Sequence, residues 1–275
     1  MRLLAAALMA CLLAAPAASA SETWGYLRDA LFEGRAILDG DGVVEISAPA
    51  RAQQAGRLPV EITTHLPQTV FGRITRMTVL IDENPAPVAA VVELGEGAAR
   101  GTLGLHLRIN ENSDVRVVAE TADGRLFMAK TFVKGAGGCA DGGYPSAVMA
   151  ERAVGDVLVD PVRTVAVGEP ADPLGLARRG ERFGEVSLAL RHPNDSGFML
   201  HPIDRTWIPV NIVEELEISL AGVPVMRLEG SISLSTNPDL RFLVRGGAGD
   251  RLDLRFRDTD GHEFERSVKL RGEGA

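Results

Sequence analysis

Short apolar runs follow one another closely from residue 43 to residue 133, and each is bounded by Gly, Pro, Asn or Asp. Runs of this length, rich in β-branched residues, predict β-strands. Asp123-Gly124 lies between two of them and is typical of a tight hairpin. A short helix is expected before them, with Ser21 as N-cap, apolar positions at helical spacing from Trp24, and Gly34 as its end. The predicted strands are residues 43–46, 58–66, 74–81, 88–94, 103–109, 115–119 and 126–133.

A second series of similar runs extends from residue 186 to residue 270. Residues 217–220 and 251–256 alternate between apolar and polar positions, which predicts strands with one face on a core and one in water. Turn residues such as Asn237-Pro238 and Asp260-Gly261 separate the runs. The predicted strands are residues 186–190, 212–220, 223–228, 231–235, 240–244, 252–256 and 263–270.

The two series predict an all-β protein with two immunoglobulin-like β-sandwich domains, at residues 21–133 and 183–275. The chain has 275 residues, of which 45% are apolar, so it is long enough for two cores. Glycine and proline interrupt the pattern between residues 134 and 182. We expect a Gly-rich cysteine-bearing arm there, followed by a long, partly ordered linker with a helical turn at residues 145–152.

The N-terminus has the pattern of a secretory signal peptide. Met1-Arg2 precedes an apolar stretch from Leu3 to Ala15, and Ala18-Ser19-Ala20 is a small-residue cleavage site. We therefore expect residues 1–20 to be removed by cleavage after Ala20 and the mature protein to be exported. The apolar stretch is too short to span a bilayer, so no membrane span is expected. A second reading, a lipoprotein cleavage box at residues 8–11, stays open.

Removal of the signal peptide leaves Cys139 as a lone cysteine, which cannot form an intramolecular disulfide. Glycines surround it, and their conformational freedom predicts an exposed, flexible arm. An exposed thiol is a liability in an exported protein, so we interpret Cys139 as a covalent attachment point or nucleophile. An incidental surface thiol and an intermolecular disulfide are the alternatives. The glycines expected to give the arm its flexibility are Gly135, Gly137, Gly138, Gly142 and Gly143.

Composition and motifs argue against several classes of function. The net charge of −8 disfavours nucleic acid as a partner, because phosphate binding needs a clustered positive field. P-loop, G-x-S-x-G and H-E-x-x-H patterns are absent from the sequence, and we expect no cofactor and no metal. The segment from His192 to His201, with Asp195 and Asp204, is interpreted as a solvated loop because its spacing matches no zinc pattern.

The histidines do not favour an enzyme. An activated thiol needs a nearby base, and none of the histidines lies close to Cys139 in the sequence. A glycine-rich arm also holds a catalytic geometry poorly. We expect each histidine to be a surface or strand-end residue: His65, His106, His192, His201 and His262.

The segment Gly137-Gly138-Cys139 with Gly142-Gly143 resembles the cysteine arm of SoxY, the covalent sulfur-carrier subunit of the thiosulfate-oxidising Sox system. Sequence before it also resembles SoxY, and sequence after residue 183 is similar to its partner subunit SoxZ. Such an arrangement resembles the fused SoxYZ-like carriers associated with quinoprotein dehydrogenases in bacterial periplasms. The SoxY-like positions include Trp24, residues 43–46, Ala48-Pro49 and Leu58-Pro59-Val60, and the SoxZ-like ones His192-Pro193, Gly197, Ile208-Pro209, Ile232-Ser233, Asn237-Pro238 and residues 258–261.

This resemblance implies a non-catalytic carrier, whose Cys139 holds a sulfur-linked cargo and presents it to periplasmic redox enzymes. Those partners would belong to a Sox-type pathway or to a pyrroloquinoline quinone (PQQ)-dependent dehydrogenase system. A separate SoxY subunit ends with its cysteine arm, whereas here a whole domain follows Cys139, so the arm would enter a partner as a loop. Two alternatives stay open: a protein-binding accessory module that does not use the thiol, and a thiol peroxidase or reductase.

Overall fold

A computed structural model of the chain describes residues 22–66, 72–135, 137–140, 154–165, 183–201 and 203–273. It divides into two units, residues 1–34 and residues 35–275. Helix α1 (Glu22–Phe32) in the first unit ends just before Gly34, whose φ of 74° favours glycine, and its Trp24 and Phe32 rings lie 6.4 Å apart. The predicted helix is confirmed. The predicted signal peptide and the helical turn at residues 145–152 lie outside the described residues.

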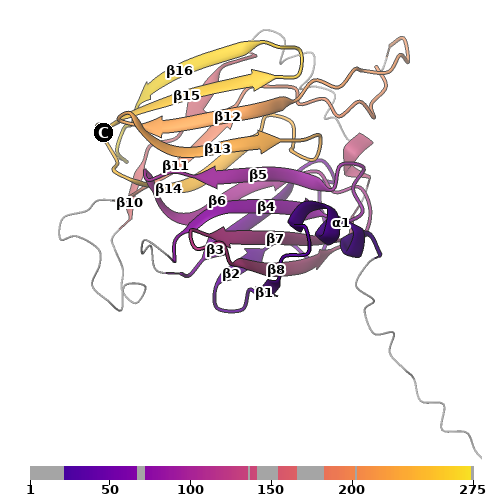
Figure 1. Ribbon diagram of the computed structural model, residues 1–275. Helices are drawn as coiled ribbons and strands as arrows, with labels where there is room; N and C mark the ends of the chain where they lie inside the picture. Colours follow the sequence, from indigo (N-terminus) through magenta and orange to yellow (C-terminus); the bar gives the residue numbers. More distant parts are fainter. Residues whose placement is uncertain are drawn as a thin grey trace, which may run out of the picture. The chain divides into compact units, whose positions relative to one another are not determined.

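The second unit is built from two β-sheets (Figure 1). The nine-stranded sheet has the order β1-β8-β7-β4-β5-β13-β12-β15-β16, and the seven-stranded sheet contains β10-β11-β14-β6-β3-β2 with β9 also on β11. Strands of the first sheet are β1 (Ile37–Asp39), β4 (Ile74–Ile81), β5 (Val88–Leu94), β7 (Ser113–Thr121), β8 (Leu126–Val133), β12 (Val213–Leu220), β13 (Val223–Gly230), β15 (Arg251–Asp258) and β16 (Glu263–Lys269). Strands of the second are β2 (Val44–Ser47), β3 (Leu58–Thr64), β6 (Ala98–Leu107), β9 (Val157–Val159), β10 (Arg163–Val165), β11 (Phe183–Leu190) and β14 (Asp239–Arg245).

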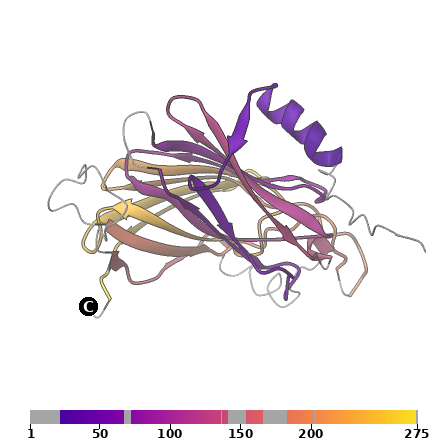
Figure 2. The ribbon, with the colours of Figure 1, turned by 90° about the horizontal axis from the view of Figure 1, so that it is seen from below.

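Both sheets continue from the first half of this unit (residues 35–140) into the second half (residues 154–273), as Figure 2 shows from below. Strand β5 pairs with β13 in one sheet, and β6 pairs with β14 in the other, both antiparallel. Gly95 is required at the first junction, because a Cβ there would lie 2.2 Å from the Pro224 carbonyl oxygen. The two sandwiches are therefore joined through the edges of both of their sheets.

One apolar cluster extends between the sheets and across both junctions. It includes Val92 of β5 opposite Leu228 of β13, and Leu105 of β6 opposite Leu240 of β14. Alternation along β11 and β14 buries every second residue, which places one side of each strand on this core. The prediction of an all-β protein with two β-sandwiches is confirmed.

Two details of the predicted pattern are wrong. Residues 231–235 form a turn rather than a strand, because the Ser231 hydroxyl accepts the Ser233 amide and competes with strand pairing. The expected linker also contains β9 and β10, which both pair with β11 and so belong to the second sheet. Each of the two strands has only three residues, and Pro161 lies between them, so the strand signal in the sequence was weak.

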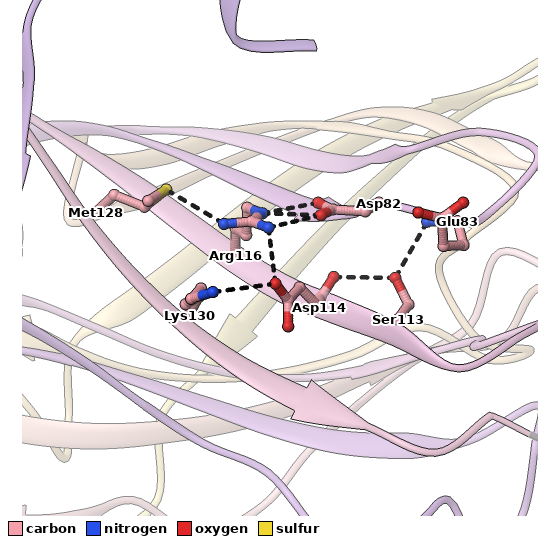
Figure 3. A network of polar contacts seen from close by, with 7 residues as sticks. All are labelled: Asp82, Glu83, Ser113, Asp114, Arg116, Met128 and Lys130. Carbon is pink, nitrogen blue, oxygen red and sulfur yellow. Dashed lines mark hydrogen bonds and ion pairs between the residues drawn. The ribbon is translucent and has the colours of Figure 1, made fainter. Parts of the chain in front are cut away.

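A buried polar network lies within the first half (Figure 3). Arg116 of β7 is 2% exposed, and its guanidinium donates to both carboxylate oxygens of Asp82 at 2.8–2.9 Å. The same guanidinium donates to Asp114 at 2.7 Å, and Lys130 of β8 lies 3.3 Å from that carboxylate. Val115 and Val117, the neighbours of Arg116 in β7, face the core, so the alternation of the strand turns Arg116 to the other face of the sheet. Arg116 is buried on that face as well. The network compensates the charge of a guanidinium that water does not reach.

Candidate functional site

Cys139 lies in a short 3₁₀ helix, η1 (Gly138–Ala140), that follows β8. The expectation of an exposed thiol is wrong for this structure, because Cys139 is 2% exposed. Backbone hydrogen bonds fix the approach to η1: the Gly137 amide donates to the Asn110 carbonyl at 2.7 Å, and the Gly138 amide donates to the Ile109 carbonyl at 2.8 Å. The cysteine-bearing turn is thus docked against the segment that follows β6.

Two of the surrounding glycines allow this close docking. A Cβ on Gly138 would lie 1.9 Å from the Ala55 carbonyl oxygen, and a Cβ on Gly135 would lie 2.2 Å from the carbonyl oxygen of Glu111. Gly137 has open space around its Cα but adopts a φ of 79°, which favours glycine. Gly142 and Gly143 lie outside the described residues. The role of these glycines in flexibility stays a prediction, and close packing is a second reason for Gly135 and Gly138.

The second half of the protein also holds the cysteine turn. The Ser196 hydroxyl, from the segment between β11 and β12, donates to the Cys139 carbonyl, and the Phe198 amide donates to the Ser196 oxygen at 3.3 Å. Ser196 is itself buried, at 1% exposed. The cysteine turn (residues 137–140) therefore sits where the two halves of the chain meet, with hydrogen bonds to each of them.

Arg108 is the main charged residue at this place, and it is fully buried. It follows β6 in the first half, and its guanidinium donates to the Ile232 carbonyl at 3.0 Å, to the Leu234 carbonyl, and to the Thr236 hydroxyl at 3.0 Å. Its own carbonyl accepts a hydrogen bond from Asn84 at 2.8 Å. Through these contacts Arg108 links the two halves next to the cysteine turn.

The electrostatics of the site keep the thiol protonated. Burial raises the pKa of Cys139, and the positive charge of Arg108 opposes this shift without overcoming it. Burial also raises the pKa of Asp195, again against the influence of Arg108. Because the thiolate is the nucleophile, the docked state lowers the reactivity of Cys139 both by excluding reagents and by suppressing ionisation.

The segment that begins at His192 is not the solvated loop that the sequence suggested. His192 and Asn194 are fully buried, Ser196 is 1% exposed and Asp195 8%. The His192 Nδ1 accepts the Asn194 amide at 3.0 Å, and the Asn194 side chain binds the Leu234 carbonyl and the Val213 amide. Burial lowers the pKa of His192, while Asp258 at 3.5 Å opposes that shift. These polar residues hold together the junction on which η1 rests.

The other histidines are paired with carboxylates: His65 with Glu45, His106 with Asp239, His201 with Asp204 and His262 with Asp258. In the part of the chain that the structure describes, no group of three or more His, Cys, Asp or Glu side chains could hold a metal ion. None of the helices described there is long and apolar enough to cross a membrane.

Sequence reasoning found Cys139 but missed Arg108 and Ser196, and it placed Asp195 in a solvated loop. Arg108 ends a strand pattern, where an arginine is normally solvated, and the polar run from His192 to Ser196 has the composition of an exposed turn. Pairing of β5 with β13 and of β6 with β14 brings the two halves together, and no short-range pattern encodes these pairings.

Comparison with protein families finds two matches. Residues 28–139 match the family described as sulfur oxidation protein SoxY, and residues 176–269 match the family described as sulphur oxidation protein SoxZ. The first match ends at Cys139. No curated protein matches the chain significantly.

Two solved structures are similar to parts of the chain. The sulfur carrier protein SoxY from Chlorobium limicola f thiosulfatophilum is 20% identical, with a TM-score of 0.34, over 41% of this chain and 90% of that chain. A beta-glycosidase from Bacteroides vulgatus is 8% identical, with a TM-score of 0.22, over 83% of this chain and 24% of that chain.

Proposed function

Because the chain belongs to the sulfur-oxidation families SoxY and SoxZ, as a SoxYZ-like fusion of the two, we propose that it is a covalent carrier whose Cys139 holds a sulfur-linked group. The two families imply a carrier role in sulfur oxidation. The observation that supports Cys139 as the attachment site is its position: it is the last residue of the SoxY match, on a turn that both halves of the protein hold. We further propose that the chain is exported to the periplasm after cleavage at Ala20.

Loading of such a carrier is an oxidation. Joining the Cys139 sulfur to a sulfur anion forms an S–S bond, releases one proton from the thiol and releases two electrons. The partner must therefore accept two electrons, which favours periplasmic redox enzymes of a Sox-type pathway or of a PQQ-dependent dehydrogenase system. A later partner removes the cargo. Between these steps, the chain around Cys139 raises the effective concentration of the cargo at each partner.

Burial of the thiol sets a condition on this function. The Cys139 side chain is 2% exposed, so a sulfur-linked group of several atoms does not fit in the docked turn without displacing it. The turn must therefore leave its position before the thiol is loaded. Docking then protects the empty carrier from oxidation, which is a hazard for a free thiol outside the cytoplasm.

The same burial favours a second candidate function. A cysteine that stays docked is an interior residue of a protein-binding accessory module, in which the joined sandwiches bind a partner without using the thiol. Free cysteine is among the residues most often found buried in proteins, and its burial alone does not require a chemical role.

The intact mass of the native protein separates the two candidates. We expect protein purified without reductant from host cells with a running pathway to exceed the mass of residues 21–275, and to return to that mass after reduction. A Cys139→Ser variant from the same cells is the control and should carry no added mass. Repeated recovery of an unmodified thiol under these conditions would instead support the accessory module.

A further inference from the structure

Large apolar side chains gather on the segment between β11 and β12, which we call the apolar loop (residues 196–201 and 203–210). Ile203 is 81% exposed, Trp207 67%, Phe198 45% and Val210 44%. Figure 1 shows this segment in orange, extending past the ends of the strands. Exposed apolar residues are normal when scattered, but a group on one projecting loop is typical of a contact surface for another molecule.

The apolar loop is ordered by its own hydrogen bonds. Leu200 and Trp207 form a bridge, the His201 amide donates to the Thr206 carbonyl at 2.7 Å, and the Ile208 amide donates to the Met199 carbonyl at 2.9 Å. Asp204 accepts the Thr206 amide at 3.1 Å. A loop ordered in this way presents its side chains without a large loss of conformational entropy on binding, which favours affinity.

The base of the apolar loop is attached to the cysteine turn. Asp195 and Asn211 close the loop by exchanging backbone hydrogen bonds of 2.7 and 3.1 Å. The next residue, Ser196, donates its hydroxyl to the Cys139 carbonyl. Any enzyme whose active site reaches the sulfur of Cys139 therefore approaches the region from which the apolar loop projects.

We propose that the apolar loop is the docking element for the redox enzyme that loads Cys139, and that it inserts Ile203 and Trp207 into an apolar cleft beside that enzyme's active site. This inference rests on the proposed carrier function and adds a recognition surface to it. Tryptophan is enriched among the residues that contribute most to binding free energy, and a well-packed central tryptophan commonly accounts for a large share.

A partner enzyme explains the surface better than a membrane or a second copy of the chain does. Binding to anionic lipid needs a basic cluster, whereas the protein has a net charge of −8 and Asp204 lies at the tip of the loop, paired with His201. Self-association through this loop would enclose the cysteine turn that it adjoins, and so would block access to the thiol.

The test measures the loading of Cys139 in host cells for three full-length proteins. They are the wild type, an Ile203→Ser/Trp207→Ser variant, and a Leu158→Ser/Val223→Ser control that removes two exposed apolar side chains elsewhere, 51% and 43% exposed. We expect the apolar-loop variant to load at least about ten-fold more slowly by intact mass, and the control to load like the wild type. The purified, reduced proteins should all react with iodoacetamide at rates within about two-fold of one another, because docking of the thiol is unchanged.

Several results overturn the proposal. Equal loading of the wild type and the apolar-loop variant removes the docking role alone, whereas a wild type that is never loaded removes the carrier function and the docking role together. If iodoacetamide alkylates the apolar-loop variant more slowly than the wild type, the slower loading comes from a change in the cysteine turn and not from lost docking of the enzyme. If the wild type sediments as a dimer and the apolar-loop variant does not, the surface serves self-association. If the wild type floats with phosphatidylethanolamine/phosphatidylglycerol vesicles and the variant does not, the surface binds a membrane.

Discussion

Two arginines of the first half are buried to the same extent but are held by different kinds of group. Arg116, 2% exposed, is paired with the carboxylates of Asp82 and Asp114 (Figure 3). Arg108, fully buried, donates to the Ile232 and Leu234 carbonyls and to the Thr236 hydroxyl, which all belong to the second half. One guanidinium is therefore compensated within its own half, and the other reaches across the junction.

The difference separates a structural charge from one that acts on the site. Carboxylates compensate the charge of Arg116 where it lies, so its effect is confined to the stability of the first half. The oxygens of residues 232–236 solvate Arg108 but carry no net charge. The field of Arg108 reaches Cys139 and Asp195, where it lowers both pKa values against the effect of burial.

Replacing Arg116 tests the structural side of this comparison and should have the largest effect. We expect Arg116→Met to reduce the free energy of unfolding by about 3–5 kcal/mol, because it leaves the Asp82 carboxylate buried without its bidentate partner. Chemical denaturation measures the change. Arg251→Met is the matched control, since Arg251 is 69% exposed in its pair with Asp253, and it should cost under about 1 kcal/mol. Equal losses in the two variants would refute the structural role of the buried pair.

Replacing Arg108 should cost less stability but should also change the thiol. Arg108→Met removes the donors to residues 232–236, and we expect a loss of about 2–3 kcal/mol in the free energy of unfolding. The alkylation rate of Cys139 should rise only at higher pH than in the wild type, because the charge that lowers its pKa is gone. Arg116→Met should not move the pH dependence of the alkylation rate. Arg108→Lys keeps the positive charge and should therefore have a pH dependence close to that of the wild type. A profile that does not move in Arg108→Met contradicts the assigned role.

The sequence predicts the strands better than it predicts the site, and these arginines show why. Bounds such as 74–81, 88–94 and 126–133 agree with β4, β5 and β8, because period-2 patterns and turn residues act locally. Burial of Arg108 and Arg116 depends on partners far away in the sequence, at residues 232–236 and at Asp82. The burial of Cys139 has the same origin, since glycine content predicts a free arm and only the tertiary fold brings Ala55, Ile109 and Ser196 against it.

The docking of the cysteine turn can be tested through its glycines. Gly138→Ala places a Cβ 1.9 Å from the Ala55 carbonyl oxygen, where backbone atoms cannot move aside easily, so the turn should undock. A cost of about 1–3 kcal/mol corresponds to alkylation of Cys139 that is about 5- to 150-fold faster. Gly137→Asn is the control, because the site is open and asparagine tolerates a positive φ. If all three proteins react at the same rate, the turn is not docked in solution.

The smallest expected effect is a loss of stability at alkaline pH. The pKa of Cys139 is raised above the ordinary thiol value of 9.0, so the folded protein holds this proton more tightly than the unfolded chain does. Its contribution is fully present below the ordinary value and declines as pH rises from there toward the raised value, by at most about 1.4 kcal/mol per pH unit. Denaturation between pH 7 and pH 10.5 measures this decline, which Cys139→Ser should remove. Arg108 opposes the upward shift of the Cys139 pKa, so Arg108→Met should extend the decline in stability to higher pH. Arg116 does not act on this pKa, so Arg116→Met should leave the pH range of the decline unchanged. The opposite outcome would reverse the roles given to the two arginines.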